Sequence, residues 1–184
     1  MLRLAASSFL LLFLFSFTAR AQAPTGRKLT LGVEQDLLPY ATGGYFAGLW
    51  AGKGHLRVRA LTARVHKPDL IVKKGFTNNR VTAYALVGDY FLHQNWKGWW
   101  AGSGLVYWKS SIQAGAKSST AYYENLLING SLGYHQRLFG PVYLSPWAGM
   151  HLRVGGAKKV AVDGKVFTPP LLNPEASLKL GICF

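Results

Sequence analysis

Acidic residues are scarce in this sequence. Its 184 residues include 7 Asp and Glu against 21 Lys and Arg, which gives a formal net charge of +14 at pH 7. Such a balance suits anionic partners, whether nucleic acid, anionic lipid or phosphorylated glycolipid. Cysteine is nearly absent too, because Cys183 is the single one. One cysteine excludes an intramolecular disulfide framework, so we interpret Cys183 as a small structural residue.

Long hydrophobic runs are missing after the first 21 residues, so a transmembrane helix is not expected there. Within those residues, Arg3, the apolar stretch 9–17 and Ala19-Arg20-Ala21 have the order of a secretory signal peptide. We predict a cleaved signal over residues 1–21 and one domain over 22–184. An uncleaved anchor is the alternative, but its apolar run is shorter than the ~20 residues a span needs. Losing two arginines leaves 21 − 2 = 19 basic residues against 7 acidic, or +12.

Recognised chemical motifs are also missing. There is no G-x-S-x-G nucleophile elbow, and no Gly-rich stretch is followed by Lys-Ser or Lys-Thr. The histidines lie at spacings that make no zinc motif: His55, His66, His93, His135 and His151. We therefore expect no catalytic residues, no cofactor and no metal. Export makes nucleic acid an unexpected partner.

What the sequence has instead is apolar content, 49% of residues with 14% aromatic, spread over short alternating segments. Alternation with period two, punctuated by Gly, Asn and Pro, is typical of strands and hairpins. The eight segments that we expect to form strands are 28–38, 43–52, 55–66, 80–92, 99–109, 122–136, 142–154 and 175–184. In the seventh, Pro146 predicts a bulge or bend.

The last segment alternates without interruption up to Phe184. Its apolar face holds Ala176, Leu178, Leu180, Ile182 and Phe184, and the other face holds Glu175, Ser177, Lys179, Gly181 and Cys183. A closing strand that ends on an aromatic residue resembles the assembly signal of bacterial outer-membrane proteins. With the signal peptide and the alternating strands, the chain resembles the small, about eight-stranded bacterial outer-membrane β-barrels.

That resemblance implies an all-β fold, a closed antiparallel up-and-down transmembrane barrel. After the first hairpin the connections alternate between short and long, as expected for tight periplasmic turns and long outward loops, and both chain ends then lie in the periplasm. A soluble sandwich or lipocalin-like barrel is the alternative. It would place polar faces outward, whereas a membrane barrel inverts this arrangement. Aromatic residues near strand ends, Trp50, Trp96, Trp99 and Trp100 among them, are expected at the membrane interface.

Charges on the face assigned to the lumen must pair, because an unpaired charge in a confined interior is costly. We expect Arg153 to face Glu175 in the last hairpin, and a bulge near Ala60 to bring Arg64 beside Arg57. The predicted members of a lumen ion-pair network are Glu34, Asp36, Arg57, Arg59, Arg153, Glu175 and Lys179. A structural plug of this kind is the preferred interpretation.

Lysines recur in the three long connections, at positions 67, 73, 74, 117, 158, 159 and 165. Such residues serve solubility, or they contact lipopolysaccharide phosphates, for which Lys73, Lys74, Lys158 and Lys159 are the candidates.

We predict a monomeric, non-enzymatic outer-membrane barrel of a Gram-negative bacterium. Its partners are outer-membrane lipid, lipopolysaccharide and, during insertion, the barrel-assembly machinery. The alternatives are a narrow pore and, less favoured, a lipid A acyl hydrolase that uses Ser177, His151 and Glu175.

Overall fold

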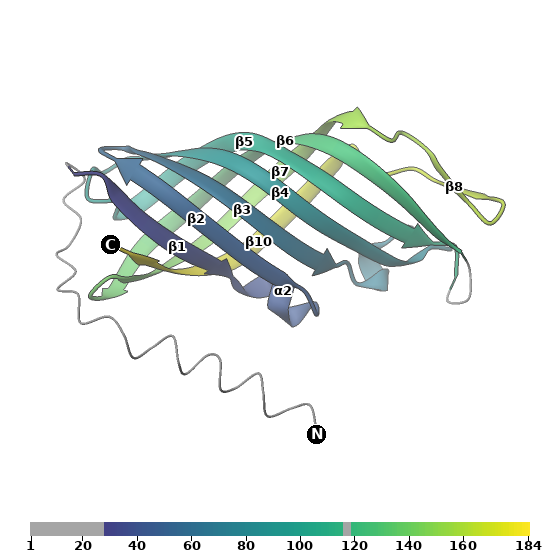
Figure 1. The fold of residues 1–184 in the computed structure, drawn as a ribbon, viewed down its shortest axis with the longest axis horizontal. Coiled ribbons are helices and arrows are strands. Elements are labelled where there is room, and N and C mark those ends of the chain that lie inside the picture. Colours follow the sequence, from purple (N-terminus) through teal and green to yellow (C-terminus); the bar gives the residue numbers. More distant parts are fainter. Residues whose placement is uncertain (1–27, 116–118) are drawn as a thin grey trace, which may run out of the picture.

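The computed structural model of this chain describes residues 28–115 and 119–184, so the predicted signal peptide lies outside the described residues. Eight antiparallel strands close into a barrel in the order β1-β10-β7-β6-β5-β4-β3-β2 (Figure 1). They are β1 (Thr30–Asp36), β2 (Tyr45–Lys53), β3 (Leu56–His66), β4 (Thr77–Phe91), β5 (Gly98–Gln113), β6 (Thr120–Phe139), β7 (Val142–Gly156) and β10 (Leu172–Cys183). The predicted fold class is confirmed.

The two ends of the barrel differ. At the turn end, residues 54–55, 92–97 and 140–141 connect neighbouring strands, and β1 and β10 lie side by side through the pair Gly32 and Cys183. At the loop end, the connections include the short helix α2 (Leu37–Ala41), the 3-10 turn η1 (Asp69–Ile71), and a hairpin of β8 (Val160–Val162) and β9 (Lys165–Phe167). The long connections thus gather at one end, as the sequence predicts.

The two faces of the barrel wall have opposite polarity. Leu86 and Leu105, paired across β4 and β5, point outward with 60% and 56% of their surface exposed. Glu34, Arg59 and Asp89 point inward and are almost wholly buried. No helix among the described residues is long and apolar enough to cross a membrane. The apolar surface of this chain is therefore on the outer side of its strands, opposite to the arrangement of a soluble barrel.

Several local predictions are wrong. Residues 110–121, expected as a long loop, mostly extend β5 and β6, which leaves 114–119 as the connection. The β3 register runs evenly against both neighbours, so no bulge forms at Ala60, and Arg64 stays on the outer face. The register on the two sides of Pro146 is also unchanged, so no bulge forms there. Pro146 stays within the regular strand, and because it has no N–H the ladder lacks one hydrogen bond there.

An aromatic plug fills the lumen at the turn end. Its buried members are Trp50, Phe91, Trp96, Trp100, Tyr143 and Cys183. The sequence predicts the three tryptophans of this set at the membrane interface. Strand parity turns Trp50 and Trp100 inward instead, because neighbouring residues of a strand face opposite sides. Trp96 lies in the 92–97 connection, and its Nε1 donates to the Gly54 carbonyl at 2.6 Å.

Glycines make the room for these rings. A Cβ atom added to Gly133 would lie 2.3 Å from the Trp100 ring, whereas at Gly130 on the same strand it would meet nothing within 4 Å. We therefore expect Gly133→Ala to lower the free energy of unfolding by about 1–3 kcal/mol through overpacking. Gly130→Ala is the matched control and should stay near zero. Urea titration of both variants in lipid vesicles measures the difference, and equal values would contradict the packing.

Candidate functional site

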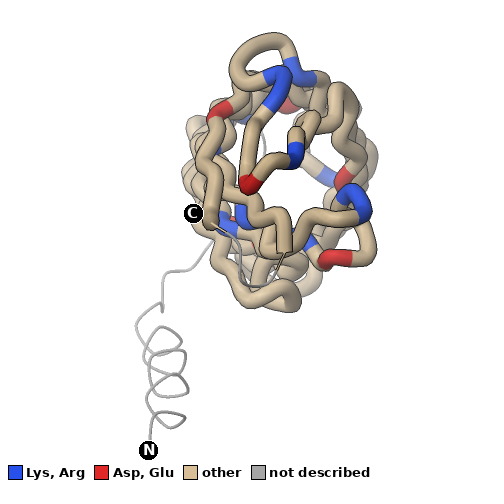
Figure 2. Tube along the Cα trace, turned by 90° about the vertical axis from the view of Figure 1, so that its right-hand side faces the viewer, with Lys and Arg blue, Asp and Glu red and all other residues tan. Residues whose placement is uncertain are grey.

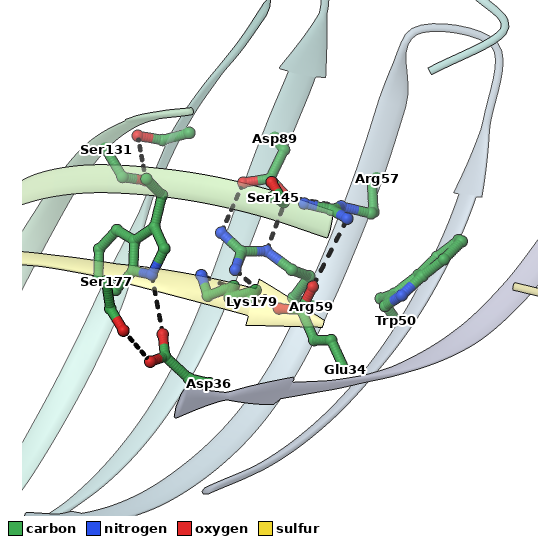
Figure 3. Close-up of polar contacts among 12 residues, drawn as sticks. Glu34, Asp36, Trp50, Arg57, Arg59, Asp89, Ser131, Ser145, Ser177 and Lys179 are labelled. Carbon is green, nitrogen blue, oxygen red and sulfur yellow. Dashed lines mark hydrogen bonds and ion pairs between the residues drawn. The ribbon is translucent and has the colours of Figure 1, made fainter. Parts of the chain in front are cut away.

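The middle of the lumen holds a buried network of charges, with Asp89 of β4 at its centre (Figure 3). Arg57 Nε donates to Asp89 Oδ2 at 2.8 Å. Arg59 makes a two-point contact, with Nε at 2.7 Å from Oδ2 and Nη2 at 2.8 Å from Oδ1. One carboxylate thereby fixes the guanidinium groups of both arginines, which are neighbours on the inner face of β3.

Glu34 of β1 binds the same two arginines from two strands away, past β2. Arg59 Nη1 donates to its Oε1 at 2.9 Å, and Arg57 Nη1 lies 3.6 Å from its Oε2. Lys179 Nζ of β10 lies 4.0 Å from Glu34 Oε1, and the Tyr143 hydroxyl donates to Oε2 at 3.1 Å. The carboxylate therefore links β1 to β3, β7 and β10.

Aromatic faces cover the cations of this network. The Arg57 guanidinium lies 5.0 Å from the centre of the Phe91 ring, and the Arg59 guanidinium lies 5.1 Å from the Trp100 ring. Lys179 Nζ is 4.0 Å from the Trp147 ring centre. Cation–π contacts are strongest between desolvated groups, and these three cations are almost wholly buried. Charges and rings together make a continuous plug from the turn end to mid-barrel.

Asp36 lies beside this network and has different partners. It accepts hydrogen bonds from Trp147 Nε1 at 2.8 Å, from the Ser177 hydroxyl and from the Leu38 N–H at 3.2 Å. The last bond caps α2, because a carboxylate at the N-cap satisfies a free helix N–H. Asp36 thus fixes the point where β1 turns into α2.

The last hairpin has a different register from the predicted one. Glu175 lies opposite Gly149 rather than Arg153, a shift of 153 − 149 = 4 residues. An even shift keeps every residue on its predicted face. Glu175 Oε2 instead lies 2.8 Å from His151 Nε2, and Arg153 Nη1 donates to the Ala157 carbonyl at 2.8 Å. β8 and β9 lie between β7 and β10, so the residue at which β10 begins depends on the length of this hairpin.

The candidate hydrolase residues are placed in two groups. His151 and Glu175 are paired, as above, while Ser177 is hydrogen-bonded to Asp36 and to the Leu38 N–H at 3.3 Å. The serine is thus held by α2 and β1. Among the described residues, no group of three His, Cys, Asp or Glu side chains is arranged to hold a metal ion.

The loop end is folded and basic. Lys73, Lys74, Lys158 and Lys159 are exposed there, and Lys117 lies outside the described residues. Figure 2 looks onto this end and shows Lys and Arg positions along its rim. An apolar cluster beneath the rim holds the connections together: Phe76, Ile112, Val160, Val162 and Phe167. The cationic side chains are therefore presented by a packed surface.

One loop carboxylate reinforces this order. Asp69 accepts hydrogen bonds from the Thr77 hydroxyl and, at 3.0 Å, from the Asn78 N–H. These bonds hold the pKa of Asp69 below its ordinary value. The carboxylate joins η1 to the start of β4.

Solved structures with the same architecture are known. The N-terminal β-barrel domain of Pseudomonas aeruginosa OprF superimposes with a TM-score of 0.55 at 10% sequence identity, over 84% of this chain and 97% of that one. Neisserial surface protein A gives 0.51 at 11% identity, over 85% and 94%. This chain has the fold of small outer-membrane β-barrels. No protein-family model matches the sequence, and no curated protein does.

Within this barrel, the predicted lumen residues separate into three sets. Glu34, Arg57, Arg59 and Lys179 form one network, Asp36 anchors α2, and Arg153 and Glu175 lie nearer the loop end with different partners. Asp89, the acceptor of both arginines, was not predicted. Its inward parity on β4, in step with Val87 and Phe91, was the available signal.

Proposed function

We propose that this protein is a non-enzymatic, integral outer-membrane β-barrel of a Gram-negative bacterium, with a plugged lumen and basic loops that contact lipopolysaccharide. The network of Arg57, Arg59, Glu34 and Asp89 carries the proposal, because it occupies the lumen where a channel would need water. The apolar outer face supports insertion in lipid. The fold shared with OprF and Neisserial surface protein A supports the location.

This proposal gives the barrel an orientation. The turn end faces the periplasm, where an exported chain would meet the barrel-assembly machinery, and the loop end faces outward. Its exposed lysines then lie at the height of lipid phosphates, where each cation near an anionic surface contributes about 1 kcal/mol. A structural or surface-interaction role as a monomer follows from a barrel whose interior is filled and whose contacts lie at its rim.

Neutralising the loop lysines tests the proposed partner. We expect Lys73→Gln, Lys74→Gln, Lys158→Gln and Lys159→Gln, combined, to weaken binding of the purified barrel to lipopolysaccharide by at least about tenfold, with a flatter salt dependence. The control removes Lys28, Lys53 and Lys97 at the turn end, all exposed. Lipopolysaccharide and neutral phospholipid vesicles are compared. Equal binding of all three proteins to both surfaces would contradict the lysine contact.

The narrow pore is the alternative from a different class. An eight-stranded barrel has an interior just wide enough for side chains, and here those side chains are ion-paired. A steady conductance in planar bilayers at neutral pH would favour the pore over the plugged barrel.

A further inference from the structure

The loop half of the lumen has an apolar wall. Inward-facing residues of β3 and β4 are charged at Arg57, Arg59 and Asp89, but from there to Val65 on β3 and Val81 on β4 they are all apolar and several are small; the next inward residue of β4, Asn79, is polar. The apolar residues are Leu61, Ala63, Val65, Val81, Ala83, Ala85 and Val87. Membrane barrels usually carry polar residues on the inner face. Neither the plug nor the basic rim uses this surface.

A cavity of about 320 Å³ lies against this wall, within the size range of small-molecule sites. Arg59 and Lys179 line the side toward the plug, and His151, Glu175 and Trp147 line the side opposite the alanines. The cavity is thus apolar along one wall and polar along the other. Water finds hydrogen-bond partners along the polar wall but none on the apolar side chains of the other wall.

The cavity also reaches through the barrel wall. β1 ends at Asp36, opposite Lys179, so α2 rather than a strand lies between the loop halves of β10 and β2. Figure 1 shows α2 well short of the end that β5 and β6 reach. Leu38 and Pro39 of α2 line the cavity, and so do Pro174 and Ala176, which face outward on β10. An opening at this place joins the lumen to the apolar outer surface.

A cation lies at the loop-end side of the cavity. Lys67 is in van der Waals reach of Trp108, with Nζ 4.6 Å from the ring centre, and lies 3.4 Å from Asn173 Oδ1. Burial lowers the pKa of Lys67, and the negative charge of Glu175 partly opposes that shift. Lys67 also lines a second, smaller pocket with Arg153.

His151 Nδ1 and Arg153 Nε are buried and have no hydrogen-bond partner among the described residues. Buried polar atoms of this kind ordinarily have a partner.

We propose that this cavity binds one hydrocarbon chain of an anionic amphiphile, which enters sideways from the membrane past α2. The chain lies on the alanine-lined wall, and the anionic head is held near Lys67. A free fatty acid and an acyl chain of a membrane lipid share this chemistry. The inference does not depend on the lysine contacts with lipopolysaccharide, because it concerns residues inside the barrel.

Quenching of tryptophan fluorescence tests the site, since Trp108 and Trp147 both line it. The full-length barrel in lipid nanodiscs carries Trp99→Phe, which removes a tryptophan exposed on the outer face. One arm adds dibrominated stearic acid, and the other uses nanodiscs made with brominated phospholipid. We expect saturable quenching in at least one arm. Saturation by the free acid identifies a fatty-acid ligand, and quenching by the phospholipid identifies a lipid acyl chain.

Ala83→Phe fills the cavity, and Ala60→Phe on the outer face of β3 is the matched control. Displacing two methylenes of the ligand weakens its binding by about tenfold, so the cavity variant should lose that much affinity and the control none. Ala85→Leu is a smaller filling change for the case in which Ala83→Phe does not fold. Absent quenching, or equal unsaturable quenching in all variants, would overturn the proposal.

The sideways route has its own test. Leu38 N lies 3.3 Å from Ser177 Oγ, so α2 contacts β10 here. Leu38→Cys with Ser177→Cys, in a Cys183→Ser background, is therefore the pair to test for a disulfide between α2 and β10, and a free-thiol assay checks that the bond forms. We expect oxidation to slow quenching by brominated lipid and reduction to restore the rate. An unchanged rate in the oxidised protein would rule out entry past α2.

Discussion

Replacing Asp89 by Asn should lower the free energy of unfolding by about 3–5 kcal/mol, the largest loss expected from a single side chain in this barrel. Asp89 is 2% exposed and accepts three hydrogen bonds from Arg57 and Arg59. With the carboxylate gone, Glu34 is the acidic partner that remains for the two buried guanidinium groups among the described residues. Removing one partner of a buried pair is costly because the other charge stays desolvated.

Urea titration in lipid vesicles, followed by the mobility of folded and unfolded bands, measures this loss. Glu124→Gln is the control, because Glu124 is an exposed carboxylate of β6, and a change within about 0.5 kcal/mol is expected there. A second variant separates charge from packing. Asp89→Leu combined with Arg57→Met and Arg59→Met removes both arginines together with their shared acceptor, leaves Glu34 beside Lys179, and should recover part of the stability. A small effect of Asp89→Asn would mean that the arginines are hydrated through an open lumen.

Strand parity accounts for most of what the sequence predicts correctly. Apolar neighbours at the alternate positions predict Glu34, Arg57, Arg59 and Lys179 in the interior, and the structure places all four there. A register error of an even number of residues leaves each side chain on its predicted face. That is why the faces of the last hairpin are right although its pairs are displaced by four residues.

Contacts between strands were harder to predict, because they depend on where strands begin after long connections. Arg57 lies opposite Asp89 across β3 and β4, yet residues 67–76 separate these strands, and their length does not fix the register. The hairpin β8–β9 displaced the start of β10 in the same way. Asp89 and the partners of Arg153 were missed for this reason.

The aromatic residues show a different limitation. Trp99 and Trp100 are adjacent, so a strand must send them to opposite faces; the structure leaves Trp99 53% exposed and Trp100 1% exposed. The sequence predicts both at the membrane interface, because tryptophan is enriched there. The apolar wall beside Ala83 is not predicted for a similar reason. In a membrane-spanning strand, an apolar residue is expected to face lipid, whichever face it occupies.

Introducing a charge on the outer face should show whether that face is in lipid. Leu105→Arg changes a side chain that is exposed on β5 and paired with Leu86 of β4. Near the bilayer midplane, arginine in place of an apolar residue costs about 2–4 kcal/mol, falling to about 0–1 near the interfaces. Leu70→Arg is the control, because Leu70 lies in η1 at the loop end and is 95% exposed.

Both variants are unfolded by urea in phospholipid vesicles, and Leu105→Arg should lose at least about 2 kcal/mol more than Leu70→Arg. The reason is desolvation: the guanidinium leaves water only if hydrocarbon surrounds the middle of β5. A soluble barrel would tolerate both changes alike, since exposed surface positions change stability by about 0.5 kcal/mol. Equal small losses would therefore contradict the membrane placement. Such a result would not bear on the ion-paired lumen. It would mean that no lipid surrounds the barrel from which a hydrocarbon chain could enter past α2.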